Sequence, residues 1–128
     1  MHLPKQKQEF SAVPVGTPRP EELLDELFGR AIEECKRSVE LIEARDARGK
    51  GTAINKALEI VETLDLALDH TVAPELCAHL ESLYLYVQER LVRANIEFDA
   101  GPVAEATKIL EDLRSAFSQA AAAVSVAK

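Results

Sequence analysis

The chain has 128 residues, of which 47% are apolar and 29% are charged, a balance typical of one globular domain with its own core. Its formal net charge of −7 disfavours nucleic acid and anionic membranes as partners, because both contacts depend on clustered Lys and Arg. No uncharged apolar run reaches the roughly 18 residues of a spanning helix, and residues 1–7 lack the apolar core of a secretory signal. We therefore expect a cytoplasmic protein without membrane insertion.

The first 20 residues carry four of the six prolines and show no helical periodicity. We therefore expect residues 1–19 to form an extended, mobile arm. From Pro20 onward, apolar residues recur at spacings of three and four, which places them on one face of a helix. This first helix is expected to end near residues 45–48, because the glycines of residues 48–51 are typical helix stops.

Three further segments show the same apolar spacing. The second is expected to begin with an N-cap at Thr52 and to run through Leu68. The third starts at Glu75, directly after a proline. A turn at residues 98–102 separates it from the fourth segment, which ends in the alanine run of residues 120–123.

Short turns between long helices force neighbouring helices to run antiparallel. The sequence therefore predicts an all-α fold, an antiparallel up-down-up-down four-helix bundle spanning residues 20–125, with residues 1–19 as the N-terminal arm. No alternating β-branched run indicates a competing strand.

The candidate sites for chemistry are weak. Residues 49–52 lack the spacing and the preceding strand of a phosphate-binding loop. His70, Cys77 and His79 lack the paired close spacings of a structural zinc site, and no Glu has a His three residues later, as di-iron bundles require. Cys35 falls on an apolar helix face, where a thiol is inert. We therefore expect no catalytic residue, no cofactor and no metal, and we interpret the chain as a protein other than an enzyme.

Both cysteines, Cys35 and Cys77, lie inside apolar periodic segments. This favours buried free thiols in a reducing compartment over a disulfide. Arg90 and Arg93 fall on the outer side of the third segment, where we expect them to pair with nearby Glu side chains.

Residues 83–96 carry the most specific pattern in the chain: a Leu-Tyr-x-Tyr pair, then Arg-Leu, then Ala-Asn. This pattern resembles the most recognisable segment of the FliS family of flagellar export chaperones. Residues 15–24, 55–69 and 104–117 are similar to the start of the family's first helix, to its second helix and to its last. The resemblance covers about residues 10–117.

The chain also departs from the family pattern. Phe10 stands where the family usually has Tyr, and residues 28–30 read Phe-Gly-Arg where the family has Tyr, Asp or Asn, and Gly. Leu85 replaces an acidic residue between the two tyrosines, and Phe117 stands where the family often has Trp. These differences concern the arm and the helix surfaces more than the bundle.

The resemblance implies a chaperone that binds the disordered C-terminal segment of flagellin, prevents premature polymerisation and aids type III export. Flagellin is therefore the expected partner, and the flagellar export apparatus is a second partner to consider. The helix expected over residues 52–68 also carries more apolar residues than one core stripe requires, although such faces more often belong to the core.

We expect the client to lie along the second, third and fourth helices. The bundle residues predicted to contact it, by apolar packing or by a tyrosine hydroxyl at the rim, are Leu58, Val61, Leu64, Leu68, Leu80, Tyr84, Tyr86 and Val87. In the arm, Phe10 and Val15 are expected to cover part of this groove until the client displaces them.

Two alternatives stay open at this point. One is a structural or adaptor bundle that self-associates through the same apolar surface and does not bind flagellin. The other is an enzyme with a carboxylate or thiol site, which would require a bound metal or cofactor.

Overall fold

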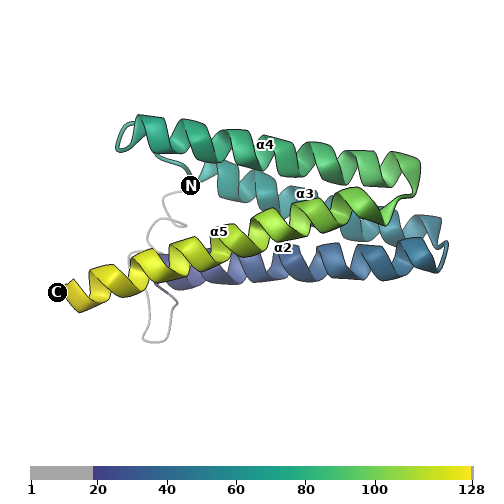
Figure 1. Cartoon of the computed structure of the whole chain (residues 1–128), viewed down its shortest axis with the longest axis horizontal. Coiled ribbons are helices and arrows are strands. Elements are labelled where there is room, and N and C mark those ends of the chain that lie inside the picture. Colours follow the sequence, from purple (N-terminus) through teal and green to yellow (C-terminus); the bar gives the residue numbers. More distant parts are fainter. Residues whose placement is uncertain (1–18, 128) are drawn as a thin grey trace, which may run out of the picture.

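The computed structural model describes residues 19–127, with side chains as far as residue 121. In this part the chain forms four helices, α2 (Pro20–Glu43), α3 (Ala47–Leu66), α4 (Pro74–Glu97) and α5 (Ala100–Ala127). Successive helices run in opposite directions along one long axis (Figure 1). The predicted all-α antiparallel bundle is therefore confirmed, while residues 1–18 of the predicted arm lie outside the described residues.

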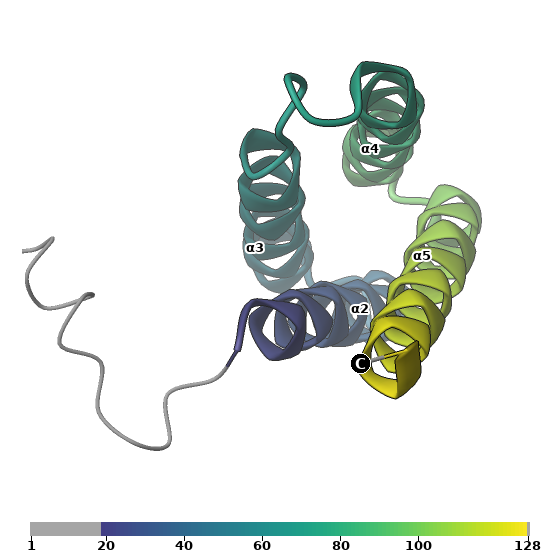
Figure 2. The same ribbon diagram turned by 90° about the vertical axis from the view of Figure 1, so that its left-hand side faces the viewer.

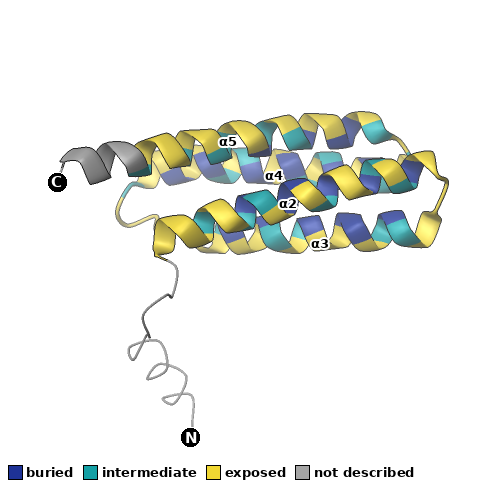
Figure 3. Ribbon diagram, turned by 90° about the horizontal axis from the view of Figure 1, so that it is seen from below, coloured by how far each residue is buried: buried dark blue, intermediate teal, exposed yellow. Residues whose placement is uncertain are grey.

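The four helices surround one core. α2 and α4 lie opposite each other and each packs against both α3 and α5, with the least extensive packing between α3 and α4 (Figure 2). Buried residues recur at helical spacing along each helix, as the dark blue bands in Figure 3 show. The large side chains that are almost completely buried are Phe28, Ile54, Val61, Leu64, Tyr84, Val87, Leu91, Val103 and Leu110.

Proline begins two of the helices. Pro20 stands in the first turn of α2, where the missing N–H costs no hydrogen bond, and Glu22 accepts a hydrogen bond from the main-chain N–H of Arg19 at 3.1 Å. Pro74 begins α4 in the same way, one position before the predicted start at Glu75.

The prediction for the first turn is wrong. Residues 48–51 lie inside α3, which begins at Ala47 instead of after an N-cap at Thr52. The side chain of Asp46 is the N-cap, because its carboxylate accepts a hydrogen bond from the main-chain N–H of Gly49 at 2.9 Å. The glycines therefore fall in the first turns of a capped helix and do not stop one.

Two non-glycine residues in the left-handed conformation reverse the chain at one end of the bundle, Arg45 after α2 with φ 60° and Phe98 after α4 with φ 56°. This backbone region is unfavourable for side chains with a Cβ atom. The two turns support each other, because the guanidinium of Arg45 lies 4.7 Å from the ring centroid of Phe98, and the ammonium of Lys50 lies 4.6 Å from the same ring.

The turn predicted for residues 98–102 is shorter than expected. α5 already begins at Ala100, so Gly101 and Pro102 belong to its first turn. The carboxylate of Asp99 accepts a hydrogen bond from the N–H of Gly101 at 2.9 Å, and a proline this early in a helix loses no intrahelical bond. At its other end α5 stays helical through the alanine run and reaches Ala127.

Candidate partner-binding site

Five of the residues predicted to bind a partner lie in the core. Val61, Leu64, Leu80, Tyr84 and Val87 each expose 7% of their surface or less. They lie on the inward stripes of α3 and α4, where they pack against the other helices. In the closed bundle these side chains do not reach the surface.

The other predicted residues are more accessible or lie outside the described part. Leu58 and Leu68 are half-buried at the edge of the core. Tyr86 is exposed, and its ring lies 5.5 Å from the guanidinium of Arg90. Phe10 and Val15 lie outside the described residues, and so does their predicted covering of a groove.

A second set of apolar side chains lies on the surface between α3 and α4. Two adjoining hollows of about 530 and 440 Å³ share Gln88 and Val92. The larger hollow lies between α3 and α4, and the smaller one is lined by residues of α4 alone. We call this feature the α3–α4 groove and define it by Leu58, Leu66, Leu85, Gln88, Val92 and Ile96.

Four large apolar side chains of the groove are exposed. The exposed fraction is 77% for Leu66 and Ile96, 57% for Leu85 and 45% for Val92. A contiguous group of exposed large apolar side chains on a small soluble domain is typical of an interaction surface.

The sequence contained a signal for this groove beyond Leu58. On α4, Leu85, Val92 and Ile96 are spaced by seven and four residues, which is a second apolar stripe beside the core stripe of the same helix. On α3, Leu66 belongs to the apolar excess seen in the sequence. Its position two residues after the buried Leu64 turns it away from the core.

The two edges of the groove differ in charge. The α3 edge carries Glu59, Glu62 and Asp65. The α4 edge carries both signs, with Arg93 placed between Glu89 and Glu97. The edges therefore present different electrostatic surfaces to a bound chain.

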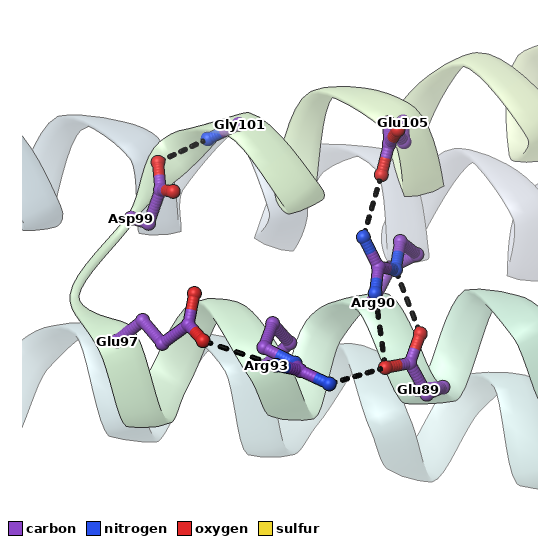
Figure 4. Close-up of polar contacts among 7 residues, drawn as sticks. All are labelled: Glu89, Arg90, Arg93, Glu97, Asp99, Gly101 and Glu105. Atoms are coloured by element: carbon purple, nitrogen blue, oxygen red, sulfur yellow. Dashed lines mark hydrogen bonds and ion pairs between the residues drawn. The ribbon is translucent and has the colours of Figure 1, made fainter.

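The arginines of α4 pair with glutamates, as predicted. Arg93 contacts Glu89 at 3.5 Å and Glu97 at 3.1 Å. Arg90 contacts Glu89 at 2.7 Å and reaches across to Glu105 of α5 at 3.1 Å, as Figure 4 shows. This network links α4 to α5 and pairs both guanidinium groups with carboxylates, which already balance their charge.

A further hollow of about 700 Å³ lies between the start of α2 and the last turns of α5. Arg114 crosses it and donates two hydrogen bonds to Asp25, at 2.8 and 3.1 Å. Below this pair the rings of Phe28 and Phe117 stack with their centroids 5.6 Å apart. Charged side chains make up about half of its lining, as they also do in the α3–α4 groove, and the Arg114–Asp25 pair spans it.

The buried titratable groups are arranged for packing. Burial raises the pKa of the Cys35 thiol to about 11 and that of Tyr84 to about 12, so both stay protonated at neutral pH. Cys35 and Cys77 are buried free thiols, as predicted.

In the described part of the chain, no group of three or more His, Cys, Asp or Glu side chains is placed to hold a metal ion. None of the helices described is long and apolar enough to cross a membrane.

The comparison with known families agrees with the pattern in residues 83–96. The profile of the family described as flagellar protein FliS matches residues 4–124. The chain belongs to the FliS family. The resemblance inferred from the sequence is therefore confirmed over nearly the whole chain.

Several relatives in the FliS family are named flagellar secretion chaperones. The FliS of Bacillus subtilis (strain 168) is 33% identical over 106 residues, which cover 83% of this chain and 78% of that protein. The FliS of Salmonella typhimurium is 32% identical over 101 residues, covering 78% and 75%. A crystal structure of a flagellar chaperone from bacteria has a TM-score of 0.75 at 18% identity, covers 93% of this chain and 97% of that one, and shares its fold.

The structure explains why the FliS-like pattern in α4 has its spacing. Tyr84, Leu91 and Ala94 lie on the core stripe, and Ala94 leaves room for close packing. Arg90 joins α4 to α5, and Asn95 accepts hydrogen bonds from Lys50 of α3. The pattern therefore connects α4 to both of its neighbours, while Leu85, within the same pattern, lines the groove.

Proposed function

We propose that this protein is a cytoplasmic flagellar export chaperone without enzymatic activity. It binds the disordered C-terminal segment of flagellin, prevents its premature polymerisation and presents it for type III export. Membership of the FliS family and the names of the relatives support this proposal. The observation that carries it is the set of exposed apolar side chains gathered in the α3–α4 groove.

The groove has the physical properties that such a client needs. Burying a large aliphatic side chain that was fully exposed contributes about 1.5–3 kcal/mol, and four side chains of the groove are substantially exposed. A disordered segment that folds into an amphipathic helix can cover them all, at the cost of its own ordering. That cost keeps binding reversible, as release at the export apparatus, the second proposed partner, requires.

The proposed contact residues follow from accessibility. Leu58 lines the groove directly, and it is joined by Leu66, Leu85, Val92 and Ile96. Leu68 and Tyr86 contribute at the margins of the bundle. The buried residues predicted from the sequence, Val61, Leu64, Leu80, Tyr84 and Val87, would contact a client only if the helices separated, and Phe10 and Val15 stay a prediction for the arm.

Isothermal titration of the full chain with the C-terminal segment of flagellin from the same organism tests the function. We expect a saturable one-to-one isotherm with a negative heat-capacity change. The groove is tested by Leu85→Ser, with Leu76→Ser as the matched control, because both leucines lie on α4 and both are 57% exposed, but only Leu85 lines the groove. Leu85→Ser should weaken binding about tenfold, equivalent to about 1.4 kcal/mol, and Leu76→Ser should not.

The negative results have distinct meanings. No heat from a chain that circular dichroism shows to be folded would contradict flagellin binding. A stable dimer in sedimentation, combined with that result, would favour the self-associating bundle. Equal losses for the two serine variants would contradict the groove as the site.

A further inference from the structure

The α3 edge of the groove carries negative charge that no cation balances. Glu59, Glu62 and Asp65 are spaced by three residues and follow one side of α3 for about 9 Å. Among the described side chains, no Lys or Arg forms an ion pair with any of the three. Lys56, on the same helix, lines a hollow on the α2 side instead.

One of these carboxylates is also incompletely hydrogen-bonded. The Oδ1 atom of Asp65 is buried and has no hydrogen-bond partner among the described residues. A buried acceptor without a donor is unfavourable, and no protein donor offsets the charge of this carboxylate among the described residues. Asp65 lines the groove together with Leu66 and Val92, so a chain lying on those side chains passes beside this carboxylate.

The opposite edge of the groove differs. On α4, Glu89 and Glu97 already pair with Arg93, and Glu89 also pairs with Arg90. A bound helix therefore meets most of the uncompensated negative charge on its α3 side. This asymmetry selects a ligand with charge on one side of its apolar face.

We propose that the α3–α4 groove selects an amphipathic helix that carries Lys or Arg along one border of its apolar face, and that this border lies over Glu59, Glu62 and Asp65. The inference rests on the proposed function, since the helix is supplied by the C-terminal segment of flagellin. The apolar stripe from Leu85 to Ile96 extends for about 16 Å, so about three helical turns of client occupy it. Basic residues spaced by three or four positions then match the acidic edge.

Charge also argues against a second copy of this chain as the occupant. The protein has a formal net charge of −7, and neither edge of the groove has a net positive charge. In a two-fold dimer through this face, the acidic α3 edge would meet either the partner's α3 edge or its α4 edge, and neither offers net positive charge to balance it. A helix with a basic border meets the same surface without this penalty.

The test neutralises the edge without touching the apolar residues. The triple variant Glu59→Gln, Glu62→Gln, Asp65→Asn is compared with a control triple of Glu26→Gln, Glu40→Gln and Glu43→Gln, exposed acids of α2 away from the groove. Both variants change the net charge by the same amount. Binding of the flagellin C-terminal segment is measured by titration calorimetry at low and at high sodium chloride.

The expected results separate this inference from the proposed function. Wild type and the α2 control should bind equally and lose about tenfold in affinity at high salt, whereas the groove variant should lose about tenfold at low salt and respond little to salt. A groove variant that binds like wild type at both salt concentrations would overturn the charge selection and leave the flagellin function intact. Absence of binding by folded wild type would contradict the function itself, and with it this inference.

Discussion

Lys50 of α3 donates hydrogen bonds to two oxygens of Asn95 of α4, its main-chain carbonyl at 2.9 Å and its side-chain amide oxygen. Lys50 is only 7% exposed, and no carboxylate among the described residues pairs with it. Its charge is stabilised instead by the negative end of the α4 dipole and by the ring of Phe98. The Lys50 side chain thus joins the start of α3 to the end of α4.

Replacement of Asn95 should therefore destabilise the fold. Asn95→Ala removes one acceptor from a nearly buried ammonium group, and we expect a loss of about 2 kcal/mol in the free energy of unfolding. Asn95→Asp keeps an acceptor and should lose less. Urea unfolding followed by circular dichroism measures both, and a double-mutant cycle with Lys50→Met isolates the coupling. Strictly additive losses in that cycle would show that the two residues do not cooperate.

The two glycines at the start of α3 should respond to alanine in different ways. A Cβ at Gly51 meets nothing closer than 4.0 Å, so Gly51→Ala should stabilise by about 0.5–1 kcal/mol through helix propensity. A Cβ at Gly49 would lie 2.6 Å from the Oδ2 atom of Asp46, so Gly49→Ala displaces the N-cap. We expect it to be about 1 kcal/mol less stable than Gly51→Ala in the same urea experiment. Equal stabilities would mean that Asp46 does not cap the helix.

Acid should weaken the link between α2 and α5. The hydrogen bonds from Arg114 hold the pKa of Asp25 below its ordinary value of 3.8. Because the folded pKa is the lower one, the stabilisation is complete above the unfolded value and is lost as the pH falls through the folded value. Asp25→Asn should cost less than about 1 kcal/mol at pH 7, since both side chains are nearly half exposed, and should reduce the decline in stability below about pH 4.

This prediction is checked by urea unfolding from pH 7 to pH 2.5, with Glu26→Gln as the control for loss of a neighbouring surface charge. The difference between wild type and Asp25→Asn should also shrink in 1 M sodium chloride. A difference that persists unchanged at pH 2.5 would indicate an effect other than the ion pair.

The thiol of Cys35 should react only when the bundle opens. It is completely buried, and its pKa is raised to about 11. In the variant Cys77→Ala, which keeps one thiol, an aromatic disulfide reagent at pH 8 should label the native protein at a rate set by unfolding. Urea near the transition midpoint should raise this rate steeply. Fast labelling without denaturant, at the rate seen in the fully unfolded chain, would contradict this burial.

The periodicity of the sequence determined the number of helices, the antiparallel bundle and most of the core, because spacings of three and four residues impose a buried stripe on any packed helix. The same pattern could not separate a core stripe from a binding surface. Val61 and Val87, which stay predicted partner contacts, are buried in the bundle, whereas Val92 and Ile96 are exposed on a stripe outside the dominant period. Which stripe is buried depends on the neighbouring helices, and that is a property of packing.

The turns show the same limit. Residues 48–51 have the composition of a helix stop, yet they are helical. The chain already turns back between α2 and α3 before residue 47, where the Asp46 cap and the contact between Arg45 and Phe98 stabilise the turn. Phe98 is far from Arg45 in the sequence, so no local pattern contains that contact. The sequence by itself determined the family and the helical bundle, since both depend on local spacing and motif. Only the tertiary structure decided where the turns fall and which apolar residues form the groove, because both depend on contacts between segments distant in the chain.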